Sequence, residues 1–516
     1  MNMRKGLSLF TTLGLSLAMV AGCSSGTKAP SGSSGTPGTG ASGTPAAPVK
    51  QTFSMLTESH ASWPYNKDWL IWKLLEEKTG VTIDMQVPSG KLDEAVNLAI
   101  ASGNMPDMMF MLSDQVANKF GQQGALVNIL DYINDMPNFK KWMEKYPEIS
   151  KSAIAADGKM YKFPNEGFGE TNRMIWLYRE DVFKDKGLTP PKTYDELYTV
   201  LKKLKELYPN SYPLAFRNGP SLGMLLNLSA NFSTHQGYYY ENNELKYGPI
   251  SDNYKKAIEY LNKFYKEGLI PPDWLTIDTK QWQDIMSTNR GFITFDYISR
   301  IDFFNLALRK DNPKFNMAFM APPAGLPGGK QLNAYTQFVE SGLTVSSKSK
   351  NIKNVMKYID FYYSDEGRNI ASWGKEGETY TVVNGKKQII KDKFIDVSDM
   401  RKKTGLATNG VYTWIDFDAH LSLASPELQA AYPEARKYDD VFRPRASFNE
   451  KEQEVISTTG LAIDKHREEN ITKFILGERS LNDWDKYIDE AKKLGLQKVM
   501  DTYKIAFERA AKTSLK

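Results

Sequence analysis

The sequence predicts an α/β protein, and the order of its first segments is the main reason. Buried-strand patterns at residues 52–56, 81–85 and 107–111 alternate with amphipathic helical patterns at 69–79 and 91–102. Such a βαβαβ order predicts a parallel sheet with helices packed on its faces. The chain has 516 residues, more than one hydrophobic core normally supports, so we expect two α/β lobes.

The remaining elements are predicted from the same two periodicities. In the first helix, Leu70, Leu74 and Leu75 recur at helical spacing, and Gly80 marks its end. Further strands are predicted at residues 174–178, 292–295, 315–320 and 337–345. Long helices are predicted at 193–208, 253–267, 352–364 and 450–476, and two more helices at 482–516.

Composition excludes several classes of protein. Hydrophobic residues make up 41% and charged residues 25%, with both signs interspersed. The net charge of +5 falls to about +3 without Arg4 and Lys5, and no basic stripe of a nucleic-acid binder is present. Beyond the N-terminal segment, no apolar stretch approaches the length of a membrane span.

The N-terminus predicts export and a lipid anchor. Arg4 and Lys5 precede an apolar stretch at 7–20, which is too short to span a membrane and is typical of a signal peptide. Cys23, the one cysteine of the chain, follows Val-Ala-Gly and resembles the modified cysteine of a bacterial lipobox. We expect residues 1–22 to be the signal peptide and Cys23 to carry the lipid; the alternative is a secreted protein with a chance unpaired cysteine.

Residues 23–50 predict a tether between that anchor and a folded body. Ser, Gly, Thr, Ala and Pro account for nearly all of this segment, which therefore has little apolar surface to bury. A flexible chain of this length has a mean reach of roughly 30 Å.

Short motifs along the body resemble those of extracellular solute-binding proteins, in particular the large lipoprotein subunits of oligosaccharide ABC importers that include the alginate-binding proteins. Ser102, Gly103, Pro106 and Asp107 form one such motif, a Ser-Gly-x-x-Pro-Asp turn. The others lie at residues 121–127, 157–164, 176–183, 193–197, 363–367 and 373–380. Each motif is weak alone, and their order and spacing carry the resemblance.

The resemblance implies a periplasmic-binding-protein-like fold of type II, in which a ligand cleft lies between two lobes joined by a hinge. We expect lobe 1 to comprise 51–164 and 336–398, and lobe 2 to comprise 165–335 and 399–516. Crossing segments are expected near 163–166, 335–338 and 397–406.

One part of the sequence departs from the family pattern. Several members carry an acidic calcium loop after the helix that follows the Tyr-Asp-Glu motif, but residues 206–213 offer too few carboxylates for the six or so oxygen ligands that calcium needs. The four histidines also lack metal-ligand spacing; they are His60, His235, His420 and His466. We therefore expect no metal and no cofactor.

Candidate ligand residues follow from the chemistry of sugars, whose C–H faces suit aromatic rings and whose hydroxyls suit planar polar groups. By resemblance to the maltose-binding proteins, the positions after the third strand, on the strand at 174–178 and after the strand at 292–295 are candidates. The side chains there are Asp114, Gln115, Trp176, Tyr178, Tyr297 and Arg300.

Composition and loop position add further candidates. His60, Trp63 and Tyr65 follow the first strand, a common ligand position in such folds. The motif residues Trp373, Glu376 and Tyr380 are equally compatible with a site and with core packing, and Trp414 and Arg443 are weaker candidates. Packing is the better interpretation for tryptophans on helical patterns, namely Trp69, Trp72, Trp142 and Trp484.

The predicted function is capture of an oligosaccharide and its delivery to an ABC-type importer by a monomeric lipoprotein on the outer face of the cell membrane. The partners implied are the permease subunits and a cytosolic ATPase. The charge of the sugar is open, because Arg173, Arg300, Arg443 and Arg445 would suit an acidic sugar whereas a neutral one is equally compatible.

Three other classes of protein remain as alternatives: a secreted carbohydrate-active enzyme, a polysaccharide-binding surface adhesin and a peptide receptor. A glycoside hydrolase needs two facing carboxylates, and no acidic residue falls in a recognisable catalytic motif. The sequence also lacks a Gly-x-Ser-x-Gly elbow, a Walker loop and zinc-ligand spacing. We therefore expect no enzymatic activity.

Overall fold

The computed structural model describes residues 50–513 except 61, 112, 167–172, 218, 220–223, 335–337, 339 and 409–414. The chain divides into two units, Met1–Ala47 and Pro48–Lys516. The predicted signal peptide, Cys23 and nearly all of the tether lie outside the described residues, so the fold below is that of the second unit.

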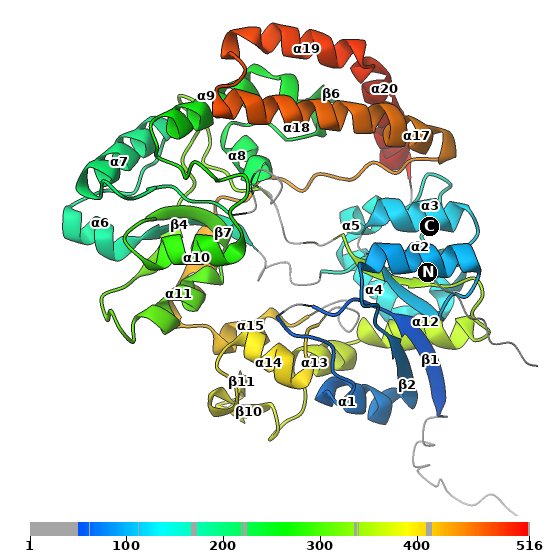
Figure 1. Cartoon of the computed structure of the whole chain (residues 1–516). Helices are drawn as coiled ribbons and strands as arrows, with labels where there is room; N and C mark the ends of the chain where they lie inside the picture. Colours follow the sequence, from blue (N-terminus) through cyan, green and yellow to red (C-terminus); the bar gives the residue numbers. More distant parts are fainter. Residues whose placement is uncertain are drawn as a thin grey trace, which may run out of the picture. The chain divides into compact units, whose positions relative to one another are not determined.

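The first sheet has the strand order β2-β1-β3-β9, and its strands β1 and β2 are labelled side by side in Figure 1. Its strands are β1 (Gln51–Leu56), β2 (Val81–Gln86), β3 (Met108–Met111) and β9 (Gly342–Val345). The first three strands are parallel, as the βαβαβ pattern predicts. By contrast, β9 runs antiparallel to β3, with Met108 opposite Val345. A segment from much later in the chain therefore completes this sheet.

Helices follow each of the parallel strands. The first is α1 (Leu70–Thr79) and the second is α2 (Leu92–Ser102), which end at Gly80 and Gly103, both with a left-handed backbone that glycine adopts without strain. The others around this sheet are α3 (Asp114–Gln122), α4 (Pro137–Lys145), α5 (Pro147–Ser152), α12 (Ile352–Tyr362) and α13 (Asp365–Trp373). Together they enclose a core that includes Phe53, Met55 and all of β3.

The Asp of the Ser-Gly-x-x-Pro-Asp motif has a structural role. The carboxylate of Asp107 accepts hydrogen bonds from the backbone N–H and the hydroxyl of Ser54, both at 2.9 Å, and from the hydroxyl of Ser349 at 2.5 Å. It therefore ties β1 to the segment that follows β9.

The second sheet has the order β7-β4-β8, and both of its pairings are antiparallel. Its strands are β4 (Met174–Arg179), β7 (Ile293–Tyr297) and β8 (Met317–Met320), and every residue of β4 is buried. Around it lie α6 (Glu180–Lys186), α7 (Tyr194–Leu207), α8 (Met224–Asn231), α9 (Asp252–Lys266), α10 (Thr279–Ser287), α11 (Arg300–Leu308) and α16 (Pro426–Arg436).

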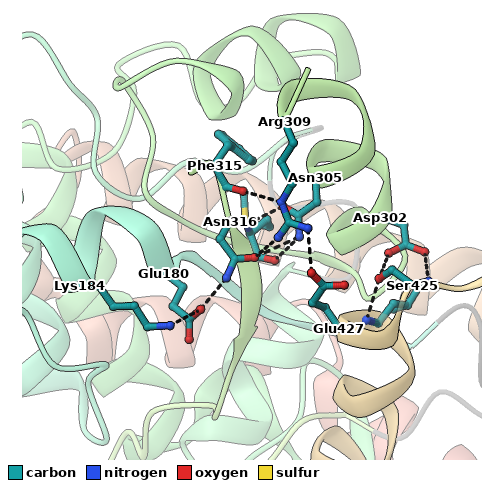
Figure 2. A network of polar contacts seen from close by, with 11 residues as sticks. Glu180, Lys184, Asp302, Asn305, Arg309, Phe315, Asn316, Ser425 and Glu427 are labelled. Carbon is teal, nitrogen blue, oxygen red and sulfur yellow. Dashed lines mark hydrogen bonds and ion pairs between the residues drawn. The ribbon is translucent and has the colours of Figure 1, made fainter. Parts of the chain in front are cut away.

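A network of polar contacts joins helices around this second sheet (Figure 2). The guanidinium of Arg309 donates to Asn316 at 2.7 Å and to Glu427 on α16 at 2.7 Å. On α11, the carboxylate of Asp302 accepts a hydrogen bond at 2.9 Å from the backbone N–H of Ser425, the residue before α16. The late segment that contains α16 is thus held against α11.

The C-terminal helices pack with a small hairpin made of β5 (Tyr238–Glu241) and β6 (Glu244–Tyr247). They are α17 (Glu450–Val455), α18 (Leu461–Leu476), α19 (Trp484–Lys493) and α20 (Leu496–Lys512). A π-helical turn at Ile456–Gly460 joins α17 to α18, so the predicted helix at 450–476 is one continuous element. In Figure 1, α18 packs against α9, and Asn262 donates to the carbonyl of Phe474 at 2.8 Å.

The segment after residue 396 differs from expectation. The predicted crossing at 397–406 is instead α14 (Val397–Thr404), and Met400, Leu406 and Ala419 lie in the core of the first sheet. Met400 and Leu406 thus pack with the first sheet, whereas Phe417 and Leu421 already pack against the core around α16, where the Phe417 ring lies edge-on to Tyr432 with 4.8 Å between centroids. The other elements there are β10 (Tyr380–Val383), β11 (Lys386–Ile389) and α15 (Phe417–Leu423).

Among the described residues, no helix combines the length and the apolar character needed to cross a membrane.

Candidate functional site

Two small pockets bring together several of the predicted ligand residues. The first pocket is lined by Thr57, Glu58, His60, Trp63, Tyr65, Trp69, Trp72 and Thr408. The second pocket is lined by Asp114, Ile149, Ser152, Ala153, Lys162, Pro164, Phe338, Phe442 and Arg445. In the first pocket most of these residues come from the loop after β1 and the start of α1, whereas the second joins five separate stretches of the chain.

The first pocket is built on a stack of two rings. The imidazole of His60 lies flat on the indole of Trp63, with 3.7 Å between ring centroids and 6° between planes. On Trp63 the guanidinium of Arg401 lies 4.8 Å from the ring centroid. Burial, and secondarily the charge of Arg401, lowers the pKa of His60. His60 therefore offers a flat ring beside Trp63 in the loop that follows β1.

Other polar and aromatic groups surround this stack. Tyr65 packs edge-on against Trp69, with ring centroids 5.8 Å apart. The hydroxyl of Thr57 is buried and has no hydrogen-bond partner among the described residues. A loop that combines stacked rings with an unused hydroxyl suits a ligand with both apolar faces and hydroxyl groups.

The second pocket is centred on Asp114, the first residue of α3. Its carboxylate contacts Nζ of Lys162 at 2.8 Å and Nη1 of Arg445 at 3.0 Å. Its backbone N–H donates to Glu340 at 3.0 Å. Asp114 therefore joins three segments that are far apart in the sequence.

Gln115, the neighbouring candidate, is directed elsewhere. Its side-chain amide donates to Gln453 at 3.1 Å, between α3 and α17. It does not line either pocket.

Tyr297 and Arg300 lie at the end of β7, where Tyr297 is the last residue of the strand rather than a residue of the loop that follows it. Nε of Arg300 lies 2.8 Å from the carboxylate of Asp296, which also holds Arg217 at 2.5 Å. Both guanidinium groups lie within about 6 Å of the Tyr297 ring centroid. One buried carboxylate thus positions two arginines next to a tyrosine.

The structure places Trp176 and Tyr178 in the core of the second sheet. Trp176 has no exposed surface and packs edge-on against Tyr194 and Phe295. Tyr178 packs edge-on against Phe183, and burial, followed by Glu180, raises its pKa to about 12. Because β4 is covered on both faces, neither ring is available to a ligand in this structure, and we leave both out of the proposed site.

Core packing also accounts for two of the motif residues. Trp373 is buried, donates from its indole N–H to Asp416 at 2.9 Å and packs edge-on against Tyr380. Glu376 is exposed in the turn between them. These three residues line neither pocket, and Trp414 lies outside the described residues.

The remaining arginines of the sequence analysis are paired with carboxylates. Arg173 is buried and forms an ion pair with Asp439. Arg443 pairs with Asp440 at 2.8 Å and lies over the ring of Tyr239.

Sequence reasoning missed four residues that shape these sites: Lys162, Glu340, Arg401 and Arg217. For Lys162 a signal existed, since it is a lysine within the otherwise apolar Met-Tyr-Lys-Phe-Pro run of a family motif. For the other three, nothing in the local sequence distinguishes them from surface charges.

No group of three or more His, Cys, Asp or Glu side chains suited to hold a metal ion occurs in the part of the chain that the structure describes. In the segment 206–213, Glu206 pairs with Lys203 at 3.2 Å.

Comparison with known proteins is consistent with this fold. The chain is 26% identical over 357 residues to the fructooligosaccharide ABC transporter substrate-binding protein FusA of Streptococcus pneumoniae, a match that covers 64% of each protein. It is 24% identical to the polygalacturonan/rhamnogalacturonan-binding protein YtcQ of Bacillus subtilis, over 85% of this chain and 88% of the relative.

Solved structures extend the likeness over the whole body. The alginate-binding protein AlgQ2 without calcium superposes with a TM-score of 0.76 at 24% identity, covering 90% of this chain and 99% of that one. FusA in complex with kestose superposes with a TM-score of 0.71 at 20% identity. The fold is therefore periplasmic-binding-protein-like, of type II, as expected.

Residues 64–369, more than half of the chain, match the family described as bacterial extracellular solute-binding protein. That span includes the second sheet, the first sheet except β1, and most residues of the second pocket, but only Tyr65, Trp69 and Trp72 of the first pocket. On the sequence match and the fold together, the chain belongs to the bacterial extracellular solute-binding protein family.

Proposed function

We propose that this protein is a solute-binding receptor that captures an oligosaccharide and delivers it to an ABC-type importer. The observation that carries the proposal is the first pocket, where stacked His60 and Trp63 rings meet polar groups at the carboxyl end of β1. Aromatic faces beside hydroxyl-binding groups are the chemistry that sugars require. The relatives support the same substrate class, because FusA and YtcQ are named for binding oligosaccharides or polysaccharides.

In this proposal, ligand residues come from both sheets. The first lobe contributes His60, Trp63 and Asp114, and the second contributes Tyr297 and Arg300. Both pockets are small, so a sugar enters when the lobes separate and is enclosed when they close by a hinge. The crossings near 163–166 and 335–338, and the lobe boundaries in general, are part of the same proposal.

The proposal includes a location outside the cell, next to the permease. Lipidation of Cys23 would hold the first residue of the mature chain in the membrane, and the segment up to residue 50 would leave a reach of roughly 30 Å. A Cys23→Ser variant is then expected in the culture medium as a folded protein that binds sugar. Retention of that variant on the membrane would contradict the anchor but not the receptor function.

A receptor binds its ligand without changing it, which separates this proposal from a glycoside hydrolase. We expect a panel of oligosaccharides, screened by thermal shift and then by calorimetry, to contain a ligand with a dissociation constant of about 1 μM or below, equivalent to roughly 8 kcal/mol. Chromatography of the same mixture after prolonged incubation should recover the sugar intact. Release of new reducing ends would contradict a receptor.

The matched variants are Trp63→Ala and Phe507→Ala. Trp63 lines the first pocket, and its truncation removes a stacking surface, so binding should weaken by at least tenfold, or about 1.4 kcal/mol. Phe507, on α20, lines neither pocket and should leave the affinity unchanged. Unchanged binding by folded Trp63→Ala would remove the first pocket from the site.

A further inference from the structure

The second pocket contains a set of charges that cancel. The carboxylate of Asp114 lies between two cations, with Nζ of Lys162 at 2.8 Å and Nη1 of Arg445 at 3.0 Å. Glu340 is the second anion, and its carboxylate lies 3.9 Å from Nε of Arg445. Two positive and two negative side chains are therefore joined here, of which Asp114, Lys162 and Arg445 line the pocket and Glu340 lies next to it.

Burial makes this balance costly to disturb. The side chain of Lys162 is only 2% exposed and that of Asp114 only 12%. A charge in such surroundings is stable only with a partner, and removing the partner typically costs several kcal/mol. The ammonium group of Lys162 is thus held in the ion pair with Asp114 and does not bind a negatively charged ligand.

Neighbouring cations offer no excess positive charge either. Arg443 is paired with Asp440 at 2.8 Å, and Lys151 with Glu148 at 3.1 Å. Between residues 50 and 513, the segments that the structure leaves undescribed contain no Lys or Arg at all. They therefore cannot supply a further counter-charge to this pocket.

Arg445 nevertheless keeps hydrogen-bonding capacity. Its side chain is 39% exposed, and its Nη2 has no acceptor among the described residues. The rings of Phe338 and Phe442 line the same pocket. A donor whose charge is already neutralised, next to aromatic rings, suits a hydroxyl group and the C–H face of a sugar.

We propose that the second pocket is a subsite for an uncharged sugar unit, and that its balanced charges discriminate against uronic acids. A uronate would bring a carboxylate next to Asp114 and Glu340 without a free cation to receive it, and like charges in an interface disfavour binding. This inference rests on the proposed receptor function and specifies its substrate class.

The test compares neutral and uronic trisaccharides of equal length by calorimetry, with kestose and maltotriose against trigalacturonate. We expect the wild-type protein to bind at least one neutral probe, and to bind it about tenfold or more tightly than trigalacturonate. Tighter binding of trigalacturonate would overturn the inference while supporting the receptor function. Failure of all sugars, neutral and uronic, would overturn the receptor function itself.

Charge variants give an independent readout. Asp114→Asn and Glu340→Gln each remove one negative charge and leave an excess positive charge in the pocket. Each should shift the ratio of the two dissociation constants toward trigalacturonate by roughly tenfold. Glu340 is 38% exposed, so its variant tests the idea even where Asp114→Asn does not fold.

Asp93→Asn is the matched control, because it makes the same change of charge at an exposed position on α2 outside both pockets. Its ratio of dissociation constants should equal that of the wild type. An unchanged ratio in folded Asp114→Asn and Glu340→Gln, or an equal shift in Asp93→Asn, would overturn the inference.

Discussion

His235 should make the folded protein sensitive to mild acid. It lies just before β5, where its Nδ1 accepts a hydrogen bond from the backbone N–H of Gly237 at 3.1 Å. Burial is the main cause that lowers its pKa, and the positive charge of Arg443 adds to it, while Asp440 acts weakly in the other direction. Together they bring the pKa from 6.5 to about 4.

The sign and size of the effect follow from that shift. Because the folded pKa lies below the unfolded value, the unfolded chain binds the proton more readily, and stability falls as the pH drops from about 6.5 toward 4. Lowering the pH from 7 to 5 should therefore reduce the unfolding free energy by about 2 kcal/mol through His235 alone, because the unfolded chain takes up the proton. His420 is completely buried, has its pKa lowered well below the usual range, and adds a loss of the same sign.

Urea titrations followed by tryptophan fluorescence at pH 7 and pH 5 measure this loss. His235→Gln should remove about 2 kcal/mol of the difference between the two pH values. Glu490, whose pKa Arg479 lowers to about 2, loses its contribution only below its ordinary pKa of 4.5 and does not act in this window. An equal loss of stability in the wild type and in His235→Gln would refute the reasoning.

Three further predictions concern the core and its connections. Trp176→Ala should lower the unfolding free energy by about 3–5 kcal/mol, whereas the sugar affinity of the folded fraction should stay unchanged, as urea titration and calorimetry would show. Asp107→Ala removes the acceptor of three hydrogen bonds and should lower the unfolding free energy by about 3 kcal/mol or more. Asp107→Asn should lower it clearly less, and equal losses in the two variants would contradict the role of the carboxylate. Gly405 has φ +73°, and an added Cβ would lie 2.6 Å from the Trp69 ring, so Gly405→Ala should lower both the melting temperature and the sugar affinity of the first pocket. An unaltered melting curve would show that Trp69 can move.

Much of the fold could be predicted because its signals are local. The runs at 52–56, 81–85 and 107–111 became β1, β2 and β3 within a residue or two, since apolar strands and amphipathic helices differ in period. Helix ends were equally local, as the left-handed Gly80 illustrates. The crossing expected near 397–406 coincides with α14, whose Met400 packs in the core of the first sheet; the sequence did not show this, because a helix between turn residues has the same pattern whichever sheet it packs on.

The candidate site was less accessible to the sequence. Trp63 and Trp176 are both tryptophans near strands of the two sheets, yet one lines a pocket and the other has no exposed surface. Periodicity shows that a residue lies on a strand face, but not that helices cover both faces of that strand. Burial depends on packing between distant elements, so local patterns do not report it.

The sequence by itself determined the family, the α/β class and most elements, because each depends on residues that are neighbours along the chain. Only the tertiary structure decided which charges meet. Asp114 and Arg445 lie 331 residues apart, and the sequence around neither residue predicts contact with the other, yet their side chains are 3.0 Å apart. The balance of charge in the second pocket is a property of that encounter, because electrostatic energy depends on distance in space and not on separation along the chain.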